Sequence, residues 1–215
     1  MRLDPELILQ LKQLRMVSGQ AEAWADFNIF DPERLERKQI GYGVDPEGNS
    51  LITYEDGSWQ ADWLVIGNMK PTGDPIIIET GEPGQPVAML MHGMGDWNAG
   101  SYLAGSVIKF IEAIEQVMHF IARENDSQTS WRVTSAGLDQ MIAAIAAADE
   151  YTDTDIWKSL LAPAYRSASA KEADLVGQVL AMSKQGMKIK DIASELHLPL
   201  KEAYGYLKKT KELQA

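Results

Sequence analysis

Histidines and the carboxylates near them are the residues of this chain whose types and spacing could do chemistry. His92 precedes Asp96 by four residues, and such a pair could orient an imidazole for proton transfer or supply two ligands to a metal ion. A zinc site needs at least three good ligands, and neither His119 nor His197 lies near this pair in the sequence. We therefore favour a hydrogen-bonded loop at His92 and Asp96, and an enzyme built on this pair is the third hypothesis.

Other residue patterns that mark enzymes are missing from the sequence. The chain of 215 residues has no cysteine, which excludes thiolate catalysis, disulfides and cysteine–zinc sites. No serine stands in a Gly-x-Ser-x-Gly elbow, and the Gly-Lys-Ser/Thr of a phosphate loop does not follow Gly81–Gly84. We therefore predict that the protein is not an enzyme, with no catalytic residue, no metal and no cofactor.

Acidic residues favour binding over catalysis. The formal net charge is −11, from 31 acidic and 20 basic residues. Residues 1–170 hold 12 basic and 25 acidic residues, about −13, and this part suits a basic partner and should repel nucleic acid. The alternative is an acidic surface that only keeps the protein soluble. The acids in turns and at strand ends that we predict to contact a protein partner are Glu55, Asp56, Asp62, Glu79, Glu82 and Asp96.

The C-terminal segment has the opposite charge balance. Residues 171–215 contain eight lysines and six acids, about +2, so only this segment could approach phosphate. Apolar residues at helical spacing predict a pattern typical of helix-turn-helix proteins over 175–209. His197 stands where such turns usually carry glycine, and Gly205 lies inside the third helix at a cost of about 1 kcal/mol. The residues predicted to bind nucleic acid, as the alternative to protein docking, are Lys201, Tyr204, Lys208 and Lys209.

The elements that must position these residues change type along the chain. Apolar residues at helical spacing, with a start signal at Asp4-Pro5-Glu6, predict a helix over 3–17, and 21–29 is a second short helix or a loop. Short β-like runs separated by turn residues then predict a meandering, mostly antiparallel sheet. The predicted strands are 41–44, 51–54, 63–66, 75–79 and 87–91.

The second half of the chain is predicted to be helical. The expected helices are 102–121, 133–148 and 156–161, then a linker of small residues at 166–170 and three short helices over 171–212. The fold class is therefore α+β, an antiparallel sheet flanked by helices, followed by an all-helical C-terminal segment. We expect an α+β domain over 1–122, a helical connector over 130–162 and a helix-turn-helix-like unit over 171–215.

Targeting signals are also absent from the pattern. The chain starts with acids where a signal peptide needs a basic and then an apolar run. Its apolar runs are too short to span a bilayer. We therefore expect a cytoplasmic protein that does not contact a membrane.

A series of short motifs begins in the predicted strand at 63–66. Trp63–Gly67 leads to Gly73–Ile76, then to His92–Trp97, and finally to Leu103–Ser106 ahead of Phe110. In order and spacing these motifs resemble the SMI1/KNR4 superfamily, also called SUKH, over residues 1–122. The resemblance implies an α+β domain with an antiparallel sheet, and the family has no established catalytic motif. The same residues have a structural interpretation as well, since glycines allow tight turns and tryptophans anchor a sheet–helix interface.

The resemblance implies a protein-binding module. Bacterial members of the family are commonly interpreted as immunity proteins that bind and neutralise toxin domains, and other members act as interaction modules in larger assemblies. Together with the acidic charge, it implies a basic toxin domain as the protein partner, neutralised by occlusion of its active face. The alternative is a transcriptional regulator that binds DNA through residues 171–215. The identity of the partner and the oligomeric state stay open at this point.

Overall fold

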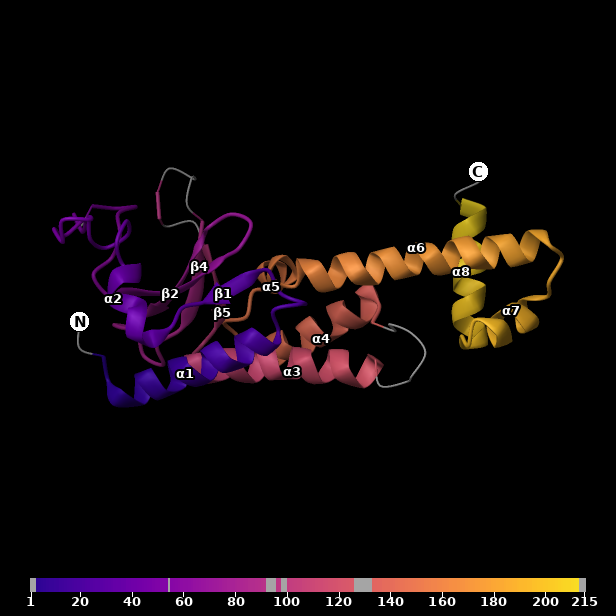
Figure 1. Ribbon diagram of the computed structural model, residues 1–215, viewed down its shortest axis with the longest axis horizontal. Helices are drawn as coiled ribbons and strands as arrows, with labels where there is room; N and C mark the ends of the chain where they lie inside the picture. The colour runs from indigo at the N-terminus through magenta and orange to yellow at the C-terminus, as the bar shows by residue number, and fades with distance from the viewer. Residues whose placement is uncertain (1–2, 54, 92–95, 98–99, 126–132, 213–215) are drawn as a thin grey trace. The chain divides into compact units, whose positions relative to one another are not determined.

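The computed structural model of the protein describes residues 3–53, 55–91, 96–97, 100–125 and 133–212 (Figure 1). The chain divides into two units, Met1–Tyr165 and Arg166–Ala215. The segment 130–162, which we expected to be a connector, therefore lies in the same unit as the residues before it. In the described part of the chain, no helix is long and apolar enough to cross a membrane.

The first unit is built on a five-stranded antiparallel sheet. Its strands follow one another in space in the order of the sequence, so each strand pairs with the next. The predicted antiparallel meander and the strands at 63–66, 75–79 and 87–91 are thereby confirmed. The strands are β1 (Phe27–Ile29), β2 (Trp63–Met69), β3 (Pro75–Glu79), β4 (Val87–Leu90) and β5 (Gly100–Ala104).

Helices cover one face of this sheet. The helices α1 and α3 lie side by side (Figure 1), and Phe27 of β1 contacts Phe110 of α3 with ring centroids 5.9 Å apart. The predicted start of α1 is confirmed, because the Asp4 carboxylate accepts a hydrogen bond from the backbone N–H of Glu6 at 2.7 Å. The helices are α1 (Pro5–Gln20), η1 (Pro32–Arg34), α2 (Leu35–Lys38), α3 (Val107–Asn125), α4 (Ser135–Ala148) and α5 (Thr154–Leu160).

The opposite face of the sheet packs against the long connection between α2 and β2. Successive residues of a strand point to opposite faces, so Ile76 and Ile78 face the helices while Ile77 faces this connection. All three side chains are fully buried, and the sheet is therefore covered on both faces. The buried cluster on the side of the connection comprises Trp59, Val65, Ile77, Ala88 and Leu90.

The start of the sheet differs from the sequence prediction. Of the described residues, 41–44 and 51–53 form no strand, and only isolated bridges join Ile40 to Val44 and Val44 to Ser50. Turns form here instead of strands, because they satisfy the backbone groups locally. For example, the Asp45 carboxylate accepts the N–H of Asn49 at 2.7 Å. Conversely, the segment 21–29, predicted as a helix or loop, supplies the strand β1.

The strand β5 was also missed. We predicted a helix from residue 102, but 100–104 pair with β4 and the helix α3 begins only at Val107. The apolar residues at 103 and 107 fit both a helix and a strand followed by a turn. Pairing with β4 decides between them, because Leu103 becomes fully buried in the sheet.

The helix α6 (Ala162–Lys184) begins in the first unit, and its residues from Arg166 onward belong to the second. The second unit also contains α7 (Ile189–Glu195) and α8 (Leu200–Glu212). Val179, Ile192 and Tyr206 form its buried core, one residue from each helix. Of the three short helices predicted over 171–212, the second and third are confirmed as α7 and α8. The run 166–170, which we expected to be a linker, is helical, because it contains no helix breaker and its alanines favour a helix.

The connection between α4 and α5 closes the outer edge of β5. Asp149 is only 6% exposed, and its carboxylate accepts the N–H of Gly105 at 2.7 Å and the ammonium of Lys109 at 3.1 Å. A carboxylate buried to this extent is stable only when such partners surround it. Residue 149 is thereby joined to the turn that leads from β5 into α3.

Backbone groups of β5 are satisfied from the same connection. The N–H of Asp153 donates to the carbonyl of Tyr102 at 3.0 Å, and the indole N–H of Trp157 donates to the carbonyl of Leu103 at 2.9 Å. An edge strand without such a cover would expose unpaired backbone groups and could pair with another chain. The helices α4 and α5 are therefore structural parts of the sheet domain.

We predict that Trp157→Ala lowers the free energy of unfolding by about 3–5 kcal/mol, because it removes a fully buried ring and the indole N–H that donates to the Leu103 carbonyl. Urea unfolding followed by circular dichroism measures this loss. Ser159→Ala, on the exposed side of the same helix, should change the free energy by about 0.5 kcal/mol or less. Equal losses in the two variants would show that α5 is not anchored through Trp157.

Candidate functional site

Four aromatic side chains gather on the sheet face that lies opposite the helices. Trp59 is 3% exposed and stands at the centre, with ring centroids 5.2 Å from Tyr42, 5.3 Å from Trp63 and 5.1 Å from Trp97. The three outer rings are only partly buried. We call Tyr42, Trp59, Trp63 and Trp97 the tryptophan cluster. We expected its tryptophans to anchor a sheet–helix interface, but they lie on the other face of the sheet, where the α2–β2 connection packs.

Three of the predicted partner-binding acids lie beside Trp97. Glu55 and Asp56 are exposed in the turn before Gly57, whose φ is +79°. The carbonyl of Gly57 accepts the N–H of Trp97 at 2.9 Å, and a side chain at Gly57 would collide with Asp96. This close approach requires glycine at residue 57. The structure thus brings Asp96 to the 55–57 turn across some 40 residues of sequence.

The other three predicted acids lie next to Trp63. Glu79 is paired across the sheet with Trp63, at the end of β3. Asp62 immediately precedes Trp63, and its carboxylate would meet any side chain at Gly81. Glu82 follows in the same turn, where its N–H donates to the carbonyl of Glu79 at 3.3 Å. Among the described residues, no Lys or Arg lies within ion-pair distance of these three carboxylates.

Crowding of these acids changes their electrostatics. Partial burial raises the pKa of Glu79 above its ordinary value, and the negative charges of Asp62 and Glu82 raise it further. Hydrogen bonds from Tyr102, whose hydroxyl donates to Glu79 at 2.9 Å, and from Trp63 act in the opposite direction. Burial and the Glu79 carboxylate together raise the pKa of Tyr102 to about 12.

Two tyrosines extend this acidic group, and sequence reasoning missed both. Tyr102 and Tyr151 are 36% and 37% exposed, and their rings meet edge to face with centroids 5.1 Å apart. Tyr102 was hidden inside the predicted helix at 102–121. Tyr151 comes from the α4–α5 connection, which was placed outside the sheet domain. A correct prediction of β5 would have found Tyr102, because strand pairing places it beside Ala88 of β4.

The arrangement is suited to binding cationic side chains. Carboxylates attract Lys and Arg, and exposed faces of Trp and Tyr rings add cation–π attraction. Trp, Tyr and Arg are also the residue types that contribute most to binding at protein interfaces. We call the surface formed by the tryptophan cluster and the six acids the acidic face, and it combines aromatic rings with carboxylates.

The hypothesis of catalysis at His92 and Asp96 falls partly outside the described residues. His92 is not among them, while Asp96 is exposed next to Gly57. Within the described ranges, no group of three His, Asp or Glu side chains could hold a metal ion. His119 and His197 are both exposed, and they lie in different units of the chain.

The predicted nucleic-acid-binding residues lie on α8. Lys201, Tyr204 and Lys208 are exposed and spaced three and four residues apart, so they share one face of the helix. Lys209 points elsewhere, because its ammonium lies 3.4 Å from a Glu172 carboxylate oxygen. The turn before α8 has the expected geometry, with the residue that replaces the usual glycine, His197, at a φ of +52°.

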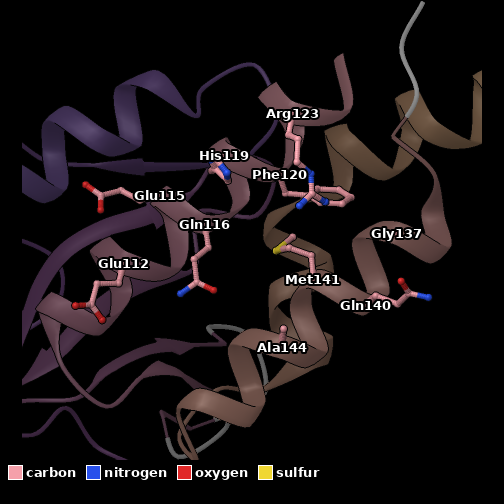
Figure 2. A pocket seen from close by; sticks show the side chains of 10 residues that line it. All are labelled: Glu112, Glu115, Gln116, His119, Phe120, Arg123, Gly137, Gln140, Met141 and Ala144. Atoms are coloured by element: carbon pink, nitrogen blue, oxygen red, sulfur yellow. The ribbon is translucent and has the colours of Figure 1, made fainter. Parts of the chain in front are cut away.

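An open groove of about 670 Å³ lies between α3 and α4 (Figure 2). Phe120 and Met141 form its apolar part, while Glu112, Glu115 and Arg123 stand on the α3 side. None of the predicted site residues lines this groove. Helical spacing alone does not distinguish a groove of this kind from a core, which is why the sequence did not mark it.

We predict that Glu79→Gln stabilises the protein relative to the wild type more at about pH 7 than at about pH 4. Because the pKa of Glu79 is raised in the folded protein, this carboxyl loses its proton at a lower pH in the unfolded chain. The charged Glu79 therefore costs stability, and this cost develops as the pH rises through the pKa of the folded state. The change should be about 0.5 kcal/mol, since solvent screens a partly buried carboxylate.

Urea unfolding at the two pH values measures this difference. Glu112→Gln, on the exposed side of α3, removes the same charge and corrects for the general effect of losing one acid. A difference between Glu79→Gln and wild type that does not grow with pH after this correction would contradict the crowding of carboxylates at Glu79.

Among the described residues, the six predicted acids thus form two groups, each next to one tryptophan of the same cluster. Trp63 borders the group of Asp62, Glu79 and Glu82, and Trp97 borders the other group. Comparisons of the chain with protein-family models, with curated proteins and with solved structures found no match.

Proposed function

We propose that this protein is a binding module of the SMI1/KNR4 type that uses the acidic face to bind a basic protein. The observation that carries the proposal is the tryptophan cluster with carboxylates next to both Trp63 and Trp97. Such a surface pairs ring faces and negative charge, which are the two features that recognise Lys and Arg in a protein partner.

The charge distribution supports a basic partner. Residues 1–170 have a formal charge of about −13, so long-range attraction would speed the encounter with a positively charged protein. A toxin that cleaves nucleic acid has a basic substrate site, and a protein that covers this site with carboxylates blocks it. We therefore propose an immunity protein that neutralises a toxin by occlusion as the specific role.

The fold is compatible with the family that the sequence resembles. Its motif residues have structural reasons in this chain: a side chain at Gly67 would collide with the Asn28 carbonyl of β1. Gly73 adopts a φ of +78° in the turn before Asp74-Pro75, where β3 begins. These reasons support the resemblance, because they tie its glycines to the pairing of β1, β2 and β3.

We predict that neutralising the Trp63 side of the acidic face weakens partner binding. In Asp62→Gln/Glu82→Gln, the loss of two carboxylates should weaken affinity for a basic partner about tenfold or more at low salt, and much less at high salt. The tagged protein is used to capture its partner from a nuclease-treated lysate of the cells that make it, followed by titration of the purified partner.

Glu112→Gln/Glu115→Gln is the matched control, because it removes two exposed acids from α3 and the same net charge. It should weaken binding about twofold or less through the lost long-range attraction. If both double variants bind the partner equally, the acidic face is not the contact. Urea unfolding of each variant separates lost binding from lost folding.

A second candidate function rests on the geometry of the C-terminal unit. The N–H of Leu198 donates to the Ala193 carbonyl at 2.8 Å, which closes the turn that joins α7 to α8. The exposed face of α8 then presents Lys201, Tyr204 and Lys208. We propose DNA binding through this face as the alternative role, with lysines contacting phosphates rather than reading bases.

If this alternative holds, Lys201→Ala/Lys208→Ala should reduce DNA affinity about tenfold at low salt and lower the salt slope by about two phosphate contacts. Fluorescence anisotropy with a labelled duplex at several salt concentrations measures both. Lys184→Ala/Lys190→Ala removes two exposed lysines from the same unit and is the control. Equal weakening by the two pairs would indicate attraction to the net charge only.

A further inference from the structure

A small pocket at the β1 edge of the sheet is lined by positively charged side chains. It has a volume of about 360 Å³, and its walls come from α1, β1, η1 and α2. The cations that line it are Arg15, Arg34 and Lys38, each exposed and each from a different helix. The acid that lines it, Asp31, already accepts the N–H of Glu33 at 3.0 Å. The pocket therefore has a net charge of about +2 in a protein whose net charge is −11.

Ion pairs elsewhere in the first unit make this pocket unusual. Each described Lys or Arg of this unit outside the segment 15–38, including Lys12 on α1, lies within 4 Å of a carboxylate. The described cations of the unit that have no such partner are Arg15, Arg34, Arg37 and Lys38. Among the described residues of the first unit, the unpaired positive charge is thus concentrated at one place, and three of these four side chains face the same pocket.

Neutral groups hold two of the three cations in position. The guanidinium of Arg15 donates to the side-chain oxygen of Asn28 at 3.1 Å. The ammonium of Lys38 lies 4.6 Å from the centre of the Phe30 ring. An amide oxygen and an aromatic ring orient a cation without cancelling its charge. Both cations are therefore positioned but still available to an anion.

We propose that this pocket binds a small molecule through a phosphate group. Three cations exceed what a single carboxylate could balance, whereas phosphate carries up to two negative charges and three or more acceptor oxygens. The planar guanidinium forks of Arg15 and Arg34 match such an oxyanion, and Lys38 adds a point charge. The volume exceeds that of a phosphate ion, and Phe30 offers an apolar wall to an organic part of the ligand. This site is independent of the acidic face and of the proposed function.

Isothermal titration calorimetry of the full chain at constant ionic strength tests the proposal. The probes are inorganic phosphate, phenyl phosphate and, as a monoanion control, acetate. We expect phosphate and phenyl phosphate to bind with one ligand per chain, and acetate to bind at least about tenfold more weakly. Tighter binding of phenyl phosphate would identify a phosphate ester as the ligand, and equal binding would identify the free anion.

Charge removal at and beside the pocket gives the decisive comparison. Arg34→Gln should weaken phosphate binding about tenfold, and Arg15→Gln/Arg34→Gln should abolish measurable heat. Arg37→Gln removes the same charge from the same segment without lining the pocket, and it should weaken binding about twofold or less. The proposal is overturned if no anion binds at about 10 mM, or if Arg37→Gln weakens binding as much as Arg34→Gln.

Thermal unfolding provides a readout of folding in the same variants. Without phosphate, Arg34→Gln should unfold at the wild-type temperature or above it, because it relieves repulsion among like charges. Phosphate should raise the unfolding temperature of the wild type but not of the double variant, since a ligand stabilises only the state that binds it. A rise of equal size in both would also overturn the proposal.

Discussion

The closure of the β5 edge is the constraint on which the rest of the first unit depends. A five-stranded meander has two free edges, and this sheet satisfies one of them with the α4–α5 connection. The buried Asp149 carboxylate and the Trp157 indole act together, one on the turn after β5 and the other on the strand itself. Neither group can be buried without its partner, so strand and connection stabilise each other.

The acidic face depends on this closure. Tyr102 reaches Glu79 only because β5 pairs with β4 and places this tyrosine next to the β3–β4 hairpin. Tyr151, from the connection, then packs on Tyr102. The helices that close the sheet therefore also set the position of aromatic rings beside the acids. Stability of the fold and shape of the candidate surface come from the same contacts.

The sequence predicted the central strands and the capped first helix, because local patterns determine these features. Short apolar runs between turn residues mark β2 to β4, and Asp4-Pro5 marks a helix start. It did not predict β1 or β5, since three to five residues at a sheet edge depend on distant partners. Nor could it place Asp96 beside Gly57 or collect Arg15, Arg34 and Lys38, which only the tertiary fold brings together.

Charge in the first unit is separated rather than mixed. Lys70, Lys109 and Lys158 are each used in local ion pairs, which leaves carboxylates such as Asp62 and Glu79 unbalanced at the tryptophan cluster. The same allocation leaves the arginines at β1 unbalanced with the opposite sign. Scattered surface charges that only maintain solubility would have no reason to sort in this way. Two patches of opposite charge, each with aromatic rings nearby, are suited to two ligands of opposite charge.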